Sequence, residues 1–439
     1  MQSNRVYKST QLNDMIRSVT CWANSLMLPA GSKIALVGKN SVYYITAILG
    51  LRESQYVSVP INYKLSKTQI KHCVQECAMI LCDKEFLDAL PSGVVVQDLR
   101  QQFCGPDLTQ ELDAGRLSMI LYTSGSTGNP KAVRFSYQDL IMQTYTASDS
   151  QVDTKFIRNV RMLGCNPFFH FAGINTISKT VYANYDLFVI PDFDPYSVFE
   201  IISRYKINTL HLIKPMLLRL LDTKNNNLEL KSVSTLWIPS TNMTVQDCEQ
   251  VKNIFPEIKN IWNFYGLTET GSAIFEHDVV PPTPYGSVGR AKNFTVAIIN
   301  DTLHVKTSEI LSDYKNINQE WFDTGDRFRV DEHGFYYYLG RADDMFKVNG
   351  EKVYPHEIET ILAGHPCVDQ VCVTSVQDDI CGAVPVAFVS LRKEINPAYL
   401  IAYARQRLAK YQIPRRIVVV EQFPTTGSGK IDRLQLFVK

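Results

Sequence analysis

The stretch Leu117-Ser-Met-Ile-Leu-Tyr-Thr-Ser-Gly-Ser-Thr-Gly-Asn-Pro-Lys-Ala-Val-Arg-Phe135 places a short polar loop between two apolar runs. The runs Leu117–Tyr122 and Ala132–Phe135 are typical of buried strands. Between them, Gly125 and Gly128 allow successive backbone N–H groups to point into one concavity, and a lone lysine follows. The stretch therefore predicts a strand–loop–strand unit whose loop binds phosphate.

The side chains of this loop suit an anion site. Several hydroxyl groups add hydrogen-bond donors, and the lysine adds a positive charge. The spacing is Gly-x-x-Gly-x-x-Lys, whereas a Walker A loop has four residues between its glycines and Lys-Ser/Thr directly after the second. A flexible surface loop rich in Ser and Gly is the alternative. The residues predicted to contact phosphate are Thr123, Ser124, Gly125, Ser126, Thr127, Gly128 and Lys131.

The composition is that of an ordinary globular enzyme. The chain has 439 residues, 45% of them hydrophobic and 20% charged, and its net charge of +1 provides no overall field for nucleic acid or an anionic membrane. The first residues lack the apolar core of a signal peptide, and no apolar run approaches the roughly 18 residues that span a bilayer. We therefore expect a cytoplasmic enzyme with no nucleic-acid partner and no membrane span. The ten cysteines form no C-x-x-C pair and are expected to be reduced thiols.

Helix and strand patterns alternate along most of the chain. Residues 1 to about 115 and 160 to 300 each read as an α/β unit, and short alternating strands follow from about 285. The predicted fold class is α/β, with a large N-terminal domain of two α/β subdomains plus a small β-subdomain. A small mobile α+β C-terminal domain follows. The predicted domain limits are 1–342 for ATP and acid binding and 343–439 for the mobile domain.

Five segments occur in an order that is similar to the signature segments of the adenylate-forming (AMP-binding) superfamily. This superfamily includes acyl- and aryl-CoA synthetases, adenylation domains of nonribosomal peptide synthesis and firefly luciferase. The resemblance covers nearly the whole chain. The segments are Tyr122–Val133, Pro167–Gly173, Tyr265–Thr270, Thr324–Asp326 with Gly340–Tyr354, and Gly427–Arg433.

The resemblance implies a nucleotide site built from both halves of the chain. It implies that Tyr265 stacks on adenine, that Thr268 bonds the α-phosphate and that Glu269 holds Mg²⁺ through oxygen. It further implies that Asp326 accepts hydrogen bonds from the ribose hydroxyls and that Arg341 lies near the same ribose and phosphate. Without the resemblance, a core aromatic residue beside a solvated carboxylate explains the Tyr-Gly-Leu-Thr-Glu-Thr motif equally well.

The resemblance also assigns roles at the C-terminal end. Asp343 occupies the position of the family's hinge between two domain orientations, and Gly350 that of a glycine lining the path of a thiol. Lys430 follows a Gly-Ser-Gly segment and matches the lysine that stabilises the charge developing on the α-phosphate and the carboxylate. A surface lysine in a loose tail is the alternative for this residue.

The acid is less well defined by the sequence. His170, in Pro167–Gly173, matches a histidine that lies between the acyl site and the nucleotide in acyl- and aryl-CoA synthetases, although a lone histidine among aromatic residues is more often a packed core residue. No Asp is present there to pair with a substrate ammonium, so an acid with an uncharged tail is expected. The polar run Pro239-Ser-Thr-Asn242 favours a compact or polar acid. Ala132 and the short chain resemble the compact o-succinylbenzoate-CoA ligases.

The predicted activity has two steps. ATP activates a carboxylic acid as an acyl-adenylate, and coenzyme A then forms the thioester, so the enzyme is an AMP-forming acid–thiol ligase that uses ATP, Mg²⁺ and coenzyme A. Two alternatives remain: an adenylation enzyme that loads the phosphopantetheine of an acyl carrier protein, and a non-catalytic sensor that binds nucleotide or acyl ligand. The identity of the acid and the oligomeric state are left open.

Overall fold

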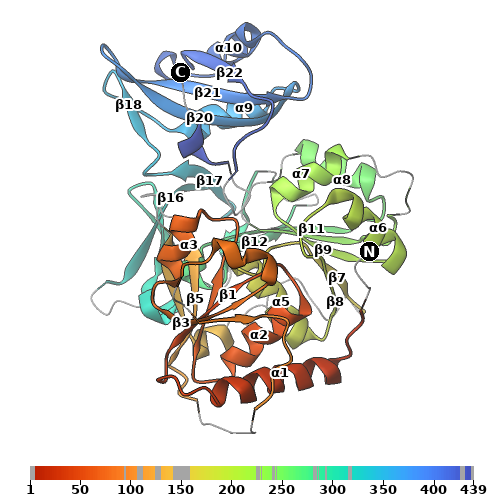
Figure 1. Ribbon diagram of the computed structural model, residues 1–439. Coiled ribbons are helices and arrows are strands. Elements are labelled where there is room, and N and C mark those ends of the chain that lie inside the picture. Colours follow the sequence, from red (N-terminus) through yellow and green to blue (C-terminus); the bar gives the residue numbers. More distant parts are fainter. Residues whose placement is uncertain are drawn as a thin grey trace. The chain divides into compact units, whose positions relative to one another are not determined.

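The computed structural model describes most of the chain as two compact units. The first contains Met1–Phe294 and Thr307–Glu320, and the second contains Thr295–Lys306 and Trp321–Lys439 (Figure 1). The described residues are 5–92, 95–105, 112–123, 130–141, 159–223, 228, 230–239, 243, 245–279, 284, 286–291, 294–314, 319–425 and 431–436.

The first sheet of unit 1 has the strand order β4-β3-β1-β2-β5-β6, in which the β5–β6 pair is antiparallel and the other pairs are parallel. Ile34 and Leu36 of β1 pack on one face, whereas Ala35 and Val37 pack on the other, so the strand is apolar throughout. The strands are β1 (Lys33–Val37), β2 (Val57–Ile61), β3 (Cys77–Cys82), β4 (Val95–Asp98), β5 (Leu117–Thr123) and β6 (Lys131–Ser136). The helices are α1 (Ser9–Asn24), α2 (Val42–Arg52) and α3 (Lys67–Val74).

The second sheet of unit 1 has the order β13-β12-β11-β10-β9-β7-β8, with antiparallel pairing only of β12 with its two neighbours. One face packs against α6, α7 and α8. The strands are β7 (Arg161–Gly164), β8 (Asp186–Val189), β9 (Thr209–His211), β10 (Thr235–Pro239), β11 (Asn260–Gly266), β12 (Ala273–Asp278) and β13 (Arg290–Ala291). The helices are α5 (Phe171–Ala183), α6 (Pro195–Tyr205), α7 (Lys214–Asp222) and α8 (Val245–Ile254).

Helix α5 joins the two sheets of unit 1. Ile174 and Ile177 pack in the core of the first sheet, whereas the Thr176 hydroxyl oxygen lies 2.7 Å from Nδ1 of His211 on β9. The helix can start close to the preceding loop because residue 173 is glycine: a Cβ there would lie 2.1 Å from the carbonyl oxygen of Pro167. The face of α5 that turns toward the second sheet therefore borders β9, β10 and β11.

Unit 2 combines a four-stranded antiparallel sheet, β14-β15-β16-β17, with a three-stranded sheet, β20-β21-β22. The Tyr338 ring on β17 lies 5.1 Å from the His356 ring on α9, so the first sheet packs on the helix that follows it. The strands are β14 (Val296–Ile299), β15 (Thr302–Lys306), β16 (Trp321–Val330), β17 (Tyr336–Arg341), β18 (Phe346–Val348), β19 (Glu351–Val353), β20 (Val368–Asp378), β21 (Gly382–Leu391) and β22 (Arg416–Val419). The helices are α9 (Pro355–Ala363) and α10 (Pro397–Arg405).

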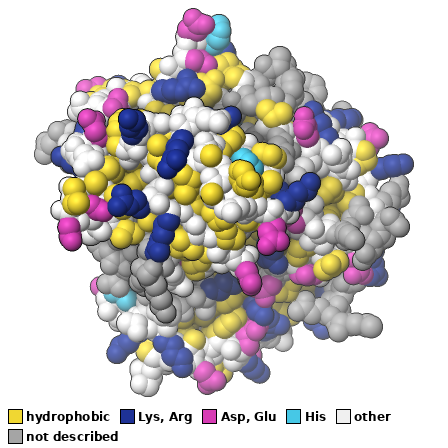
Figure 2. Space-filling view, turned by 90° about the horizontal axis from the view of Figure 1, so that it is seen from above, with side chains coloured by type: hydrophobic (Ala, Val, Ile, Leu, Met, Phe, Trp, Pro, Cys, Tyr) yellow, Lys and Arg dark blue, Asp and Glu magenta, His cyan; other side chains and the backbone are white. Residues whose placement is uncertain are grey.

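The predicted fold class is confirmed by this architecture. The predicted domain limits of 1–342 and 343–439 stay a prediction, as does the mobility of the C-terminal domain. None of the helices in the described part of the chain is both long and apolar enough to cross a membrane. Figure 2 shows basic, acidic and apolar side chains interspersed over the face seen from above, in keeping with the near-zero net charge.

Candidate active site

The β5–β6 hairpin brings Thr123 and Lys131 together at the base of the predicted phosphate loop. The two residues are paired in register, and the Thr123 hydroxyl donates a hydrogen bond of 3.4 Å to the Lys131 carbonyl oxygen. Predicted loop residues Ser124, Gly125, Ser126, Thr127 and Gly128 lie outside the described residues. The strand–loop–strand prediction is thus met at both strands, and the contacts of the loop with phosphate stay a prediction.

A tight turn after β11 presents Thr268 and Glu269. The Thr270 hydroxyl oxygen lies 2.9 Å from the carbonyl oxygen of Leu267 and 2.8 Å from that of Ser272, so it holds the turn closed from inside. Gly266 is required by the close approach of the chain, because a Cβ there would lie 2.6 Å from the Ser272 carbonyl oxygen. The polar side chains of the predicted motif therefore sit on a fixed turn at the end of a buried strand.

The structure brings Lys131 and Glu269 together although 138 positions separate them in the chain. The Lys131 Nζ lies 3.8 Å from Oε1 of Glu269 and 5.7 Å from the centroid of the Tyr314 ring. Glu269 is largely buried, whereas Lys131 is 61% exposed. A cation from one segment and a carboxylate from another thus face the same region, as an ATP–Mg²⁺ site requires.

The residues present fit a magnesium ion held together with phosphate. Mg²⁺ in nucleotide enzymes is usually bound through one or two carboxylates plus substrate phosphates and waters. Among the described residues, no group of three or more His, Cys, Asp or Glu side chains forms a complete metal cage. Glu269, a largely buried carboxylate beside a basic residue, is therefore suited to complete a coordination shell that ATP supplies.

Tyr265 and His170 lie on different elements of unit 1, β11 and the start of α5. Tyr265 is 7% exposed on β11, and its ring lies 5.7 Å from that of Phe275. His170 is the residue before the first turn of α5, with its ring 4.6 Å from that of Phe169. The stacking role of Tyr265 and the boundary role of His170 stay predictions.

Asn40 fixes the segment that carries His170, and the sequence analysis missed it. Its side-chain amide donates to the Asn166 carbonyl oxygen at 2.9 Å and accepts from the Phe168 N–H at 2.8 Å. The side chain is 6% exposed, so these two hydrogen bonds satisfy a buried amide. A polar residue three positions after the apolar strand β1 was the signal available in the sequence.

A second residue that the sequence analysis missed is Lys179 on α5. The side chain is 9% exposed, and Nζ lies 4.3 Å from the centroid of the Trp237 ring and 5.1 Å from that of Phe264. Within the described part of the chain, no hydrogen bond or ion pair is formed by this ammonium. Burial lowers the pKa of Lys179 to about 8, against a weaker raising effect of Glu276. A single lysine within the apolar run of α5 was the signal.

Apart from the weaker effect of Glu276, the polar groups described around Lys179 are a neutral ring and two buried atoms. His211 on β9 has its pKa lowered to about 3 by burial and by the charge of Lys179, so its ring is neutral near pH 7. Trp237 Nε1 and Asn175 Oδ1 are buried and find no hydrogen-bond partner among the described residues. Asn175 lies four residues before Lys179, hence on the same side of α5. Among the described residues, this cation contacts two aromatic rings and forms no ion pair, an arrangement that suits an anionic group attached to an aromatic one.

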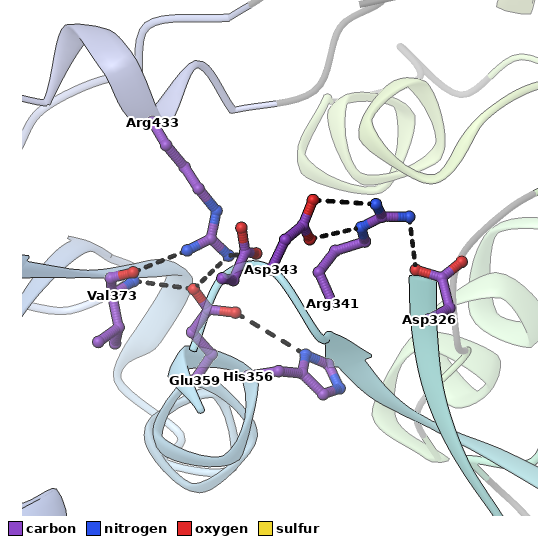
Figure 3. Close-up of polar contacts among 8 residues, drawn as sticks. Asp326, Arg341, Asp343, His356, Glu359, Val373 and Arg433 are labelled. Atoms are coloured by element: carbon purple, nitrogen blue, oxygen red, sulfur yellow. Dashed lines mark hydrogen bonds and ion pairs between the residues drawn. The ribbon is translucent and has the colours of Figure 1, made fainter. Parts of the chain in front are cut away.

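In unit 2, Asp326 and Arg341 are brought together on paired strands (Figure 3). Arg341 Nη1 donates to Asp326 Oδ1 at 3.2 Å and to the Thr324 carbonyl oxygen at 3.0 Å. Asp343 binds the other side of the guanidinium, with Nε and Nη2 donating at 2.9 and 3.1 Å. These bonds raise the pKa of Arg341 and lower that of Asp343. The predicted ribose residue, its neighbouring arginine and the predicted hinge residue therefore form one ion-paired group.

A second cluster lies beside the first in Figure 3 and centres on Arg433. Its Nη2 donates to Glu359 Oε1 at 2.8 Å, and its Nη1 donates to the Val373 carbonyl oxygen at 2.7 Å. The Val373 N–H donates to the same Glu359 oxygen at 2.8 Å. Burial opposes ionisation of Glu359, but the hydrogen bond from His356 and the charge of Arg433 still lower its pKa. Asp344 adds a weaker contact, 4.0 Å from Nη2.

Gly350 lies in a tight turn of unit 2. Asn349 and Gly350 form the two-residue turn between β18 and β19, with φ of 50° and 85°, a conformation that favours Asn-Gly. A Cβ at Gly350 would meet nothing within 4 Å. Turn geometry therefore explains this glycine, and its predicted place beside the thiol stays a prediction. Lys430 lies outside the described residues.

Matches to known families agree with the motifs. The model of the AMP-binding enzyme family matches residues 9–309, and that of the AMP-binding enzyme C-terminal domain matches residues 357–430. The chain belongs to the AMP-binding enzyme family. The predicted superfamily is thereby confirmed.

Similar proteins narrow the class. A 2-succinylbenzoate–CoA ligase of Listeria innocua is 29% identical over 423 residues, which cover 92% of this chain and 88% of that protein. A 2-succinylbenzoate–CoA ligase of Bacillus cereus is 27% identical and covers 97% and 92%. The o-succinylbenzoate CoA synthetase of Bacillus subtilis with its acyl-adenylate has a TM-score of 0.85 at 23% identity, covering 99% and 93%. The predicted enzyme class, an acid–thiol ligase, is confirmed by these relatives. A further structure of the Bacillus subtilis enzyme contains ATP and a magnesium ion.

Proposed function

We propose that this AMP-binding enzyme activates an aromatic acid that carries a second carboxylate, of the 2-succinylbenzoate kind, and transfers it to coenzyme A. The observation that supports this acid is Lys179, a buried ammonium between the Trp237 and Phe264 rings without an acidic hydrogen-bond partner in the described chain. A buried charge without a partner is costly, and an anionic group of the substrate would compensate it. The two rings would pack on the aromatic part.

Lys179 is placed so that one acid could contact it with one carboxylate while its other carboxylate reacts near Tyr265. Phe264, which contacts Lys179, directly precedes Tyr265, and α5 starts after His170 and carries Lys179 nine residues later. At 1.5 Å per residue this separation is about 13 Å along the helix, and a lysine side chain reaches back toward the N-terminus over part of it. The proposed acid thus has its reacting carboxylate near His170 and its second carboxylate at Lys179. This replaces the expectation of an uncharged tail.

In the first step, an oxygen of the reacting carboxylate attacks the α-phosphorus of ATP, and the bond to the pyrophosphate oxygen breaks. Lys131 would offset charge on the leaving pyrophosphate, and Thr268 would hold the α-phosphate. Mg²⁺ at Glu269 would neutralise phosphate charge. Asp326, held by Arg341, would bind the ribose hydroxyls, and Lys430 would stabilise the bond being made. In the second step, the thiolate of coenzyme A attacks the acyl carbon and AMP leaves.

The test is pyrophosphate release with a panel of acids: 2-succinylbenzoate, benzoate, and an analogue of the first in which the non-reacting carboxylate is a carboxamide. Each acid is supplied with coenzyme A or with a phosphopantetheine carrier protein. We expect pyrophosphate, AMP and a thioester with 2-succinylbenzoate and coenzyme A, and at least about tenfold lower kcat/KM for the other two acids. Thioester only on the carrier protein would favour a carrier-loading enzyme. Absence of pyrophosphate with every acid would favour a sensor.

A further inference from the structure

The cluster around Arg433 lies outside the nucleotide and acid residues, yet it joins three parts of unit 2. Arg433 follows Lys430 by three residues, Glu359 lies on α9, and Val373 lies in the middle of β20. Asp344, next to the predicted hinge residue, faces the same guanidinium. None of these side chains is needed to contact ATP or acid in the proposed reaction.

The base of the segment that carries Lys430 is closed by backbone contacts. Thr425 and Ile431 form an antiparallel bridge, and the Asp432 N–H donates to the Pro424 carbonyl oxygen at 2.8 Å. Arg433 comes next and contacts β20 through the Val373 carbonyl oxygen and α9 through the Glu359 carboxylate. Ile431 in the base also packs on apolar side chains of the sheet, so Arg433 supplies the polar part of the attachment.

The anchoring point is rigid. Val373 pairs with Ala387 of β21 and is fully buried, and both of its backbone groups are engaged: the carbonyl by Arg433 and the N–H by Glu359. Glu359 is 12% exposed. The guanidinium of Arg433 is planar, so its two donors to Glu359 and to the Val373 carbonyl oxygen have a fixed geometry. A lysine at position 433 could not make the same two-armed contact.

We propose that Arg433 and Glu359 are positioning residues for the adenylation half-reaction, because they fasten the base of the Lys430 segment to α9 and β20. The inference rests on the proposed function, in which Lys430 acts in adenylation and not in thioester formation. A displacement of about 1 Å at a reacting group can cost about 100-fold in rate, so loss of the fastening affects one half-reaction selectively.

The decisive variant is Arg433→Met, measured in both half-reactions. We expect adenylation, followed by carboxylate-dependent ATP–pyrophosphate exchange, to fall about 100-fold in kcat with little change in KM for ATP. Thioester formation from preformed acyl-adenylate should stay within about threefold. Arg433→Lys should recover part of the loss. The matched control is Arg392→Met, which removes another arginine–carboxylate pair of unit 2, that with Asp369 at 3.5 Å, and should leave both rates near wild type. Equal losses in both half-reactions, or a result matching the control, would overturn the proposal.

Two further measurements separate this inference from folding defects and from the proposed function. If Arg433→Met does not fold, the charge-neutral pair Glu359→Met with Arg433→Met is measured by the same criterion. If the wild type forms no adenylate, the proposed function fails, and the fastening is judged by amide hydrogen exchange. Arg433→Met should then speed exchange of the Asp432 amide at least tenfold and leave that of Val389, on the middle strand β21 of its sheet, unchanged. An unchanged Asp432 amide would refute the fastening.

Discussion

Lys179 and Arg433 are both cations that the fold removes largely from water, but within the described part of the chain only Arg433 has an ion-pair partner. Arg433 has Glu359 at 2.8 Å, a backbone carbonyl and Asp344 at 4.0 Å. Lys179 has two aromatic rings and a lowered pKa. A compensated charge is explained by the fold itself, whereas an uncompensated one costs stability and calls for a ligand. Arg433 therefore stabilises the fold, whereas Lys179 would recognise the substrate.

The largest expected effect comes from removing the counter-charge of Arg433. Glu359→Ala leaves a mostly buried guanidinium and the Val373 N–H without their acceptor. We expect a loss of about 3 kcal/mol in the free energy of unfolding of unit 2, toward the low end for buried pairs because Arg433 is one-third exposed. Urea denaturation measures it, with Asp369→Ala as the control. The Asp369 pair with Arg392 is longer, at 3.5 Å, and its loss should cost less than about 1 kcal/mol. A loss no larger than that of the control would mean that the Arg433–Glu359 pair does not stabilise the fold, in which case it would not differ from Lys179 in this respect.

Removing the charge of Lys179 should have the opposite sign. Lys179→Met keeps the length of the side chain and ends the cost of burying an ammonium, so we expect a gain of about 1–3 kcal/mol at pH 7 from a pKa lowered to about 8. Because the unfolded state binds more protons between pH 8 and 10.5, the wild type should gain stability as pH rises through that window. Thermal unfolding from pH 7 to 10 compares the two. Destabilisation by Lys179→Met would mean that the ammonium is compensated after all.

The affinity for a second carboxylate should depend on the charge of Lys179. The free enzyme loses this charge as pH rises through about 8, so KM for a dianionic acid should increase about tenfold between pH 7 and 9. His211 stays neutral throughout, because burial and the charge of Lys179 lower its pKa to about 3. The pH dependence of KM for 2-succinylbenzoate, with benzoate as control, measures it. A KM that is flat across this range for both acids would argue against contact with Lys179.

The smallest effect is expected for a third cation, Lys131, which is exposed. Its contact with Glu269 is 3.8 Å long, so Lys131→Met should change the free energy of unfolding by less than about 0.5 kcal/mol. Adenylation should nevertheless fall, because the residue is proposed to act on the leaving pyrophosphate. Urea denaturation and pyrophosphate exchange of the same protein separate the two effects. A large loss of stability would show that the pair with Glu269 is structural.

The sequence predicted the layers of the fold because strands buried on both faces are apolar throughout. The predicted strands Leu117–Tyr122 and Ala132–Phe135 agree to within one residue at each end with β5 (Leu117–Thr123) and β6 (Lys131–Ser136). Strand β3 (Cys77–Cys82) was missed because it follows α3 with no turn signal between them, and β12 (Ala273–Asp278) because its polar and apolar residues mix. The local pattern of polar and apolar residues does not predict such strands.

The site could be predicted only where residues form motifs. Lys131 and Glu269 each stand in a recognisable stretch, and the structure brings them together. Lys179 stands in no motif. Its surroundings, two aromatic rings on β10 and β11 and no ion pair among the described residues, exist only in the folded chain. Arg433 was noticed as part of a motif, but its partner Glu359 lies 74 positions away, so the contact exists only in the folded unit.

Lys179 is proposed to bind the second carboxylate of the acid. The most direct test of this proposal is the ratio of kcat/KM for 2-succinylbenzoate to that for the analogue with a neutral carboxamide, measured in the wild type and in Lys179→Met, with the exposed Lys252→Met as control. We expect the wild type and the control to prefer the dianion by about 10- to 100-fold, as a charged hydrogen bond implies, and Lys179→Met to lose that preference. The same ratio in all three proteins would contradict the account.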